Sequence, residues 1–299
     1  MSLRIFAVMG ATGHIGHVVV EDLVKRGYTV RAIGHSEEKV HKLEQEGVET
    51  FCVDFQDADA LSEAFKGCYA VFTMLPPINT DVNQDWVSEA ICKAIKASQV
   101  KRVVNLSSIG ADLEEGTGPI KWLHRHEERL NSLEGLDVLI HLRPDYFMEN
   151  LEMYLPMIKN EGLIRSPIDQ NLPIPMIATR DIGWKAADFL DCTAPLGHMV
   201  FEFIGPKNVT MNEVTDMFSY VFDHPGLWYK EISMDEAKDE MLASGWKPEV
   251  VDQMIEMYEA FNEGLIVPTE EASGTHRGIT SLEEYVHMLA HRLMALVRQ

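Results

Sequence analysis

A glycine-rich turn between an apolar run and an amphipathic stretch constrains the fold of this chain more than any other feature. The turn reads Gly10-Ala11-Thr12-Gly13-His14-Ile15-Gly16, and it follows the mostly apolar residues 3–9. Apolar residues then recur at helical spacing. In order, the three glycines permit a sharp turn, close approach of a ligand to the backbone, and close packing of helix on strand. The sequence therefore predicts a strand, a turn and a helix whose free amides bind the pyrophosphate of a dinucleotide. The candidate contacts in the turn are Gly10, Thr12, Gly13, His14, Ile15 and Gly16.

Strand-like and helix-like segments alternate through the first half of the chain. The expected strands are Leu3–Met9, Thr29–Ile33, Val48–Val53, Tyr69–Met74, Arg102–Leu106 and Asp137–Leu142. The expected helices are His14–Arg26, Glu37–Glu46, Ala58–Phe65, Asp85–Ser98 and Ile120–Leu133. This alternation predicts right-handed crossovers and an α/β fold with a doubly wound parallel sheet, the Rossmann arrangement.

The pattern changes after residue 150, where prolines become frequent and helical segments return later. We expect residues 1–150 to form the dinucleotide-binding domain. Residues 151–299 should form a smaller, mostly helical region that binds the substrate and is interleaved with the sheet near 174–205. Three helix starts are predicted from capping boxes at Thr210–Glu213, Ser233–Glu236 and Thr280–Glu283.

The charge and the cysteine content of the chain exclude several classes of function. The 299 residues carry a formal net charge of −21, which repels nucleic-acid phosphates and anionic membranes. No apolar run is long enough to span a bilayer. The four cysteines are scattered, and no His/Cys cluster has metal-ligand spacing, so we expect no metal site and a reduced, cytoplasmic protein.

The end of the second strand indicates which dinucleotide is bound. An NAD site normally has Asp or Glu there, about 20 residues after the glycine turn, but residues 30–36 contain no acid. His35, Ser36 and Lys39 could instead hold a 2′-phosphate together with the exposed amides of the next helix. The alternative is that Ser36 only caps its helix and His35 is solvated. The sequence favours NADP over NAD.

Further candidate contacts follow the next strands. Asp54 could contact the adenine, or it could cap the helix that follows. The apolar residues Met74, Leu75 and Pro76 could cover the middle of the dinucleotide. Ser107 ends the fifth strand, where its hydroxyl could orient a carbonyl substrate near the nicotinamide, although serine is also common in turns.

Several of these segments together resemble the NmrA-like family of atypical short-chain dehydrogenases/reductases. The resemblance rests on the glycine turn, Val103–Ser108, Leu142–Asn150 and Thr179–Gly183, in which Asp-Ile opens a helix, and it extends from residue 3 to about residue 190. It implies an NAD(P)-binding fold. It also implies one of two roles, NADPH-dependent reduction of quinones or azo dyes, or cofactor sensing by a regulator without turnover.

One departure from short-chain dehydrogenases limits the chemistry. Those enzymes use Tyr-x-x-x-Lys, but the matching helix has Trp122 and His126 at these positions. Alcohol dehydrogenation and sugar-nucleotide epimerisation by a tyrosine are therefore not expected. His124 and His126 could donate a proton instead, with Tyr146 as a hydrogen-bond donor, or the histidines could form a solvated helix face.

Two functions remain. The first is an NADP(H)-dependent reductase of quinone-like or other small electrophilic substrates, in which hydride transfer needs no Tyr/Lys pair. The second is a non-catalytic NADP(H) sensor that regulates a protein partner. Both predict a small-molecule ligand and neither involves nucleic acid or a membrane.

Overall fold

The computed structural model describes residues 4–77, 83–269 and 276–297, and it divides into two compact units. The first unit comprises residues 1–114, 120–143 and 182–201. The second comprises residues 115–119, 144–181 and 202–299.

The first unit is built on a seven-stranded sheet with the order β3-β2-β1-β4-β5-β6-β8. Its strands are β1 (Ile5–Met9), β2 (Thr29–Gly34), β3 (Val48–Cys52), β4 (Ala70–Met74), β5 (Arg102–Leu106), β6 (Val138–Pro144) and β8 (Gly197–Phe203). The pairs from β3 to β6 are parallel. The order reverses between β1 and β4, which is the switch point where doubly wound sheets bind ligands.

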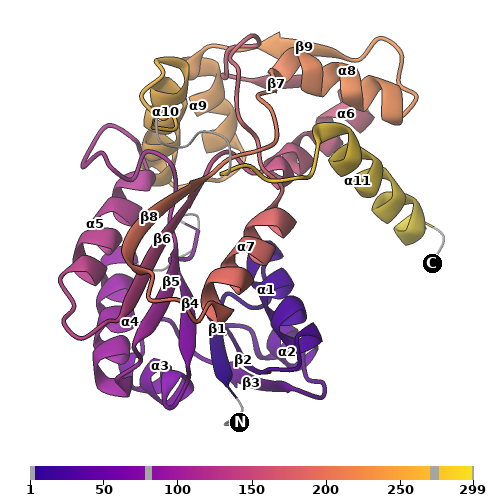
Figure 1. Ribbon diagram of the computed structural model, residues 1–299. Coiled ribbons are helices and arrows are strands. Elements are labelled where there is room, and N and C mark those ends of the chain that lie inside the picture. The colour runs from indigo at the N-terminus through magenta and orange to yellow at the C-terminus, as the bar shows by residue number, and fades with distance from the viewer. Residues whose placement is uncertain (1–3, 78–82, 270–275, 298–299) are drawn as a thin grey trace. The chain divides into compact units, whose positions relative to one another are not determined.

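Helices cover both faces of this sheet (Figure 1). They are α1 (His14–Lys25), α2 (Glu37–His41), α3 (Ala58–Phe65), α4 (Gln84–Ser98), α5 (Ile120–Asn131) and most of α7 (Thr179–Asp191). Helices α3, α4 and α5 lie on one face, and α1 and α7 lie on the other. Gly183 permits close contact between α7 and α1, because a Cβ there would lie 2.6 Å from the Cβ of Val18. The Rossmann fold predicted from the alternating pattern is confirmed.

Two parts of the first unit differ from the sequence prediction. Helix α2 ends at His41 instead of Glu46. Strand β8 is not among the predicted strands, because Glu202 interrupts its apolar pattern. The carboxylate of Glu202 is buried and accepts hydrogen bonds from the N–H and the hydroxyl of Thr269. These bonds offset the cost of burying it, and the sequence pattern does not reveal them.

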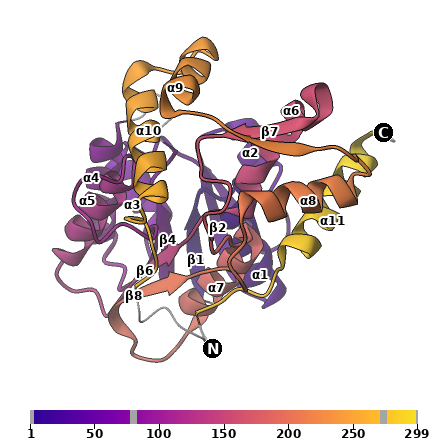
Figure 2. The same cartoon turned by 90° about the horizontal axis from the view of Figure 1, so that it is seen from above.

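The second unit consists of short helices and one two-stranded parallel ribbon, β7–β9. Its elements are η1 (Met148–Tyr154), α6 (Leu155–Glu161), β7 (Leu163–Ser166), α8 (Met211–Val221), β9 (Trp228–Glu231), α9 (Met234–Ala243), α10 (Pro248–Asn262) and α11 (Leu282–Val297). Figure 2 shows α8 and α11 side by side. Buried side chains of η1, β7, α8 and α11, including Leu151, Ile164, Phe218 and Val286, form its apolar core.

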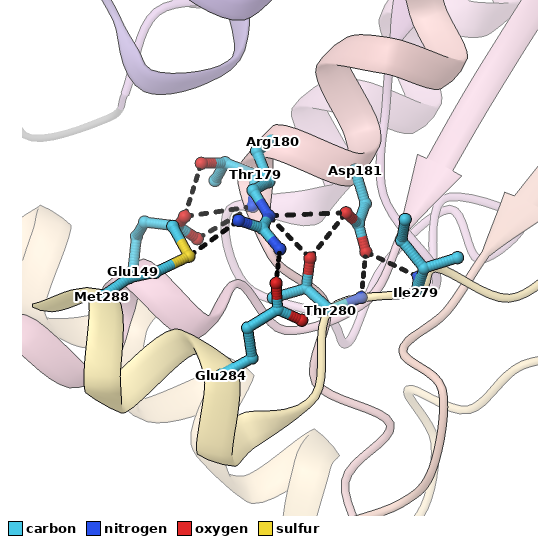
Figure 3. A network of polar contacts seen from close by, with 8 residues as sticks. All are labelled: Glu149, Thr179, Arg180, Asp181, Ile279, Thr280, Glu284 and Met288. Atoms are coloured by element: carbon cyan, nitrogen blue, oxygen red, sulfur yellow. Dashed lines mark hydrogen bonds and ion pairs between the residues drawn. The ribbon is translucent and has the colours of Figure 1, made fainter.

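A network of hydrogen bonds ties the start of α7 to the segment before α11 (Figure 3). Asp181 is buried, and its carboxylate accepts from Ile279 N–H and Thr280 N–H, each at 2.8 Å, and from the Thr280 hydroxyl at 2.7 Å. Thr179 is the first residue of α7, and both its N–H and its hydroxyl donate to the carboxylate of Glu149. These contacts explain why Thr179 and Asp181 open this helix.

The same network corrects one predicted capping box. The boxes at Thr210 and Ser233 are present, with both reciprocal hydrogen bonds. At α11, however, Ser281 and not Thr280 caps the helix, because the Ser281 hydroxyl accepts from Glu284 N–H. The Thr280 hydroxyl is used by Asp181 instead.

The predicted domain boundary at residue 150 also needs correction. The second unit begins at Pro144, where β6 ends, and Phe147 already pairs with Ile177 inside that unit. Residues 182–201 belong to the first unit, and residues 174–181 do not. The second unit is therefore not confined to the C-terminal half of the chain.

Candidate functional site

The glycine turn has the geometry that close backbone packing requires. Gly10 has φ +65°, a conformation that favours glycine, and its carbonyl accepts from Gly13 N–H at 2.9 Å. A Cβ on Gly16 would lie 2.2 Å from the Gly10 oxygen, so only glycine fits there. Gly13 is the exposed N-cap of α1 and forms no side-chain cap, and the first turn of the helix holds no acid. The amides at the helix start are thus left for an anionic ligand.

The end of β2 lies beside this turn. A Cβ on Gly34 would lie 3.5 Å from Thr12 Cγ2 and 2.6 Å from a methyl of Val40 in α2. The following residue, His35, is exposed, and its ring lies edge-on to Phe55 with centroids 6.2 Å apart. The residues predicted to discriminate NADP from NAD therefore stand next to the turn predicted to bind the pyrophosphate.

Two of the residues predicted to contact the 2′-phosphate, Ser36 and Lys39, lie at the start of α2 and within it. Ser36 is the N-cap residue of α2, but its side chain makes no capping hydrogen bond. Lys39 is exposed in the same short helix. Glu37 and Glu38 also lie in its first turn, and the carboxylate of Glu38 is paired with Lys42 at 2.7 Å.

The candidate contacts after β3 and β4 also lie in the first unit. Asp54 is exposed, and its carboxylate accepts from Gln56 N–H at 2.9 Å. The cap of α3 is Asp57, so the alternative that Asp54 caps this helix is wrong. The sulfur of Met74 would lie 3.2 Å from a Cβ on Gly10, which places this side chain against the glycine turn.

The loop after Met74 begins with a buried residue and a fixed carbonyl. Leu75 is buried, and Pro76 is half-buried. The Pro76 carbonyl accepts from the side-chain amide of Gln84, the first residue of α4, at 2.9 Å.

Ser107 is part of a buried ion-pair cluster that the sequence did not reveal. Its hydroxyl donates to the carboxylate of Glu127 in α5. Arg143 of β6 binds the same carboxylate through two nitrogens, at 2.9 and 2.5 Å. All three residues are buried, so the Ser107 hydroxyl serves this cluster rather than a substrate carbonyl. The spacing of Glu127 and Arg143 carried no signal of this pairing, because the contact forms between a helix and a strand.

Helix α5 carries Trp122 and His126, the residues expected at the tyrosine and lysine positions of short-chain dehydrogenases. The Trp122 ring packs on the core of the first unit, with the Arg125 guanidinium 4.9 Å from its centroid. His126 has no exposed surface, and its Nδ1 shares a hydrogen bond of 2.8 Å with the Ser88 hydroxyl. Burial lowers the pKa of His126 to about 3. The prediction that His126 donates a proton is therefore contradicted, since it is neutral and out of reach of substrate.

The other two candidate proton donors differ in environment. His124 is half-buried, and its Nδ1 lies 2.9 Å from the Ala111 carbonyl oxygen, so this contact holds the ring at the surface of the first unit. Tyr146 belongs to the second unit, where its ring lies edge-on to Phe261 with centroids 6.1 Å apart. Burial and the neighbouring Tyr154 raise the pKa of the Tyr146 phenol well above 10. Tyr146 is thus a hydrogen-bond donor at neutral pH.

The described residues contain neither a cluster of metal-ligating side chains nor a membrane-spanning helix. No three His, Cys, Asp or Glu side chains there come together as a metal site would need. No described helix combines the length and the apolar character needed to cross a bilayer. The four cysteines are free, and burial raises the pKa of Cys68 and Cys92 to about 11.

The chain belongs to the NmrA-like family, whose profile matches residues 4–286. The family predicted from the glycine turn and the later segments is therefore confirmed. Among curated proteins, the NAD(P)H azoreductase of Xenophilus azovorans is 28% identical over 253 residues, which cover 84% of this chain and 85% of that protein.

Two solved structures illustrate how widely this fold is used. The NADPH-dependent quinone oxidoreductase of Escherichia coli, complexed with NADPH, has a TM-score of 0.80 at 21% identity and covers 95% of this chain and 99% of its own. NmrA, a negative transcriptional regulator in complex with NAD, has a TM-score of 0.76 at 16% identity and covers 100% and 99%. At these identities the structures establish the shared fold alone.

Proposed function

We propose that this protein is an NADPH-dependent reductase of small, flat, electrophilic molecules such as quinones or azo compounds. The observation that carries the proposal is the pairing of an uncapped helix start at Gly13 with a β2 end that has no carboxylate. The name of a relative supports it, because the curated protein that matches 84% of this chain is an NAD(P)H azoreductase.

The residues of the first unit fit the cofactor in three places. The amides at the start of α1 bind the pyrophosphate, where Gly13 offers no side chain to compete. His35 and Lys39, with the amides at the start of α2, bind the 2′-phosphate that an acid at this position would repel. The side chains of Met74, Leu75 and Pro76 cover the middle of the dinucleotide. When bound, NADPH supplies the hydride for the reduction.

Proton supply separates this protein from alcohol dehydrogenases. Helix α5 provides no phenol, since Trp122 occupies the tyrosine position, and His126 is buried. Reduction of a quinone tolerates this loss because the anionic product can take its proton from water. His124, which is half-buried, remains a candidate donor for substrates that need one, whereas the phenol of Tyr146 is buried and shares a hydrogen bond with Tyr154.

The test compares four dinucleotides on the intact protein. NADPH, NADH, NADP⁺ and NAD⁺ are titrated while nicotinamide fluorescence and thermal shift are followed, and duroquinone (tetramethyl-1,4-benzoquinone) or an azo dye is then added. We expect NADPH to bind more tightly than NADH and to be oxidised when an acceptor is present. Preference for NADH would overturn the roles of His35 and Lys39, and a complete absence of turnover with quinones, aldehydes and azo compounds would overturn the reductase.

The Trp122 and His126 positions support a second candidate, a non-catalytic NADP(H) sensor. A sensor must bind its dinucleotide forms with different affinities, because a ligand with equal affinity for two states shifts neither. Tight binding without turnover, together with a difference between NADPH and NADP⁺, would favour this function over the reductase. Equal affinity for all four forms would exclude it.

A further inference from the structure

The second unit contains a pocket of about 410 Å³ with mostly apolar walls. Its walls include Ile174, Pro175, Ile204, Phe261 and Ile266. This volume lies in the range of small-molecule sites, which combine apolar walls with a few polar groups. The described residues that line it all belong to the second unit.

One carboxyl group in the wall has an unused hydrogen-bonding position. Asp145 directly follows β6 and is 6% exposed. Its Oδ1 accepts from Tyr146 N–H at 2.6 Å, whereas its Oδ2 has no hydrogen-bond partner among the described residues. A buried carboxyl oxygen without a partner is costly as an anion, and it becomes a donor when it carries a proton.

The surroundings of Asp145 favour that proton. Burial raises the pKa of Asp145 to about 7, and the nearby charge of Glu202 on β8 adds to the rise, while the Tyr146 N–H opposes it. The other charged group of the pocket, Arg277, is exposed, and its guanidinium donates to the Gly205 carbonyl at 2.8 Å. Near neutral pH the carboxyl is therefore about half protonated.

We propose that this pocket binds a neutral, flat, apolar ligand and that the carboxyl of Asp145 donates a hydrogen bond to an acceptor oxygen or nitrogen of that ligand. The apolar walls exclude strongly hydrated ions, and the carboxyl group of Asp145 disfavours an anionic group beside it. A quinone or a neutral azo compound has the required acceptor atoms. The inference rests on the proposed reductase, to which it adds the substrate pocket.

Binding can be tested without the dinucleotide. Equilibrium dialysis of the full chain with duroquinone measures affinity directly, and this fully substituted quinone has no ring hydrogen at which the exposed thiol of Cys52 could add. Because only the protonated carboxyl donates, affinity should fall about tenfold between pH 6 and pH 8, given a pKa of about 7.

Three variants sharpen the test. Asp145→Asn keeps a donor but cannot ionise, so its affinity should stay within about threefold of the pH 6 value and should not change with pH. Glu202→Gln should move the midpoint of the pH profile downward, because it removes the like charge. Val267→Trp should fill the pocket and abolish binding. Because Val267 is 52% exposed, this variant should still fold, and it tests the pocket even if Asp145→Asn does not fold.

The outcomes separate this proposal from the proposed function. An affinity for duroquinone that is flat or rises with pH in the unmodified protein overturns the donor role of Asp145. Unchanged binding in Val267→Trp overturns the pocket. NADPH oxidation is measured separately from duroquinone binding. If no acceptor causes NADPH oxidation, the proposed reductase is wrong even when duroquinone binds in this pocket.

Discussion

The ion pair between Glu127 and Arg143 should contribute to stability through coupling rather than through each residue alone. Their side chains meet through two hydrogen bonds, at 2.9 and 2.5 Å, and the residues are only 3% and 8% exposed. The perturbation is Arg143→Met, Glu127→Leu and the double variant. All are made in a Ser107→Ala background, so that no hydroxyl loses its acceptor.

The expected magnitudes follow from burial. Arg143→Met leaves the carboxylate of Glu127 buried without its partner, which should lower the free energy of unfolding by about 3–5 kcal/mol. Glu127→Leu removes both hydrogen bonds from the guanidinium and leaves it the longer ion pair with Asp112 at 3.8 Å, so this variant should also be destabilised. The double variant removes both charges, and replacing a buried pair by apolar side chains costs little, so the coupling energy should be about 3 kcal/mol or more.

Urea denaturation of the four proteins in this background at pH 7 measures the cycle. The Ser107→Ala background itself should be only about 1 kcal/mol less stable than the unmodified protein, with turnover unchanged within about twofold. Single variants that cost under 1 kcal/mol, with no coupling, would refute the argument that this pair contributes to stability through coupling. A large loss of turnover in Ser107→Ala would indicate that the Ser107 hydroxyl takes part in the reaction.

Three further predictions concern separate parts of the chain. Changing His35→Asp together with Lys39→Glu should weaken NADPH binding by about tenfold or more but leave NADH binding unchanged, as fluorescence titration would measure. Asp181→Ala should lower the free energy of unfolding by about 3 kcal/mol in urea, whereas Glu284→Gln, at an exposed ion pair, should cost under about 1 kcal/mol; equal effects would contradict the network of Figure 3. Because burial lowers the pKa of His126 to about 3 from 6.5 in the unfolded chain, the stability it contributes is complete above pH 6.5 and is lost at about 1.4 kcal/mol per unit as the pH falls below that value. His126→Gln should remove this slope in urea titrations at pH 5 and 7.

Local patterns account for the parts of the fold that the sequence predicted well. The ends of β2, β3, β4 and β5 match the predicted strands within a residue, because apolar runs bounded by glycine carry their own signal. Gly27 and Gly67 have positive φ directly after the C-cap residues of α1 and α3, as is typical of helix ends. The Gly10–Gly16 turn can be predicted from the sequence because the close contact that requires glycine at position 16 is made with Gly10 in the same turn.

Side-chain roles depended on residues far apart in the chain, and they escaped prediction for that reason. His126 was predicted at a surface, but the packing of α5 placed its ring in the interior beside Ser88. The hydroxyl of Thr280, predicted as a helix cap, was taken by Asp181, which lies 99 residues earlier. The sequence by itself thus determined the strands β1 to β6, the glycine turn and the family. The tertiary structure decided which polar groups are buried and paired, because that depends on contacts between elements that no local pattern encodes.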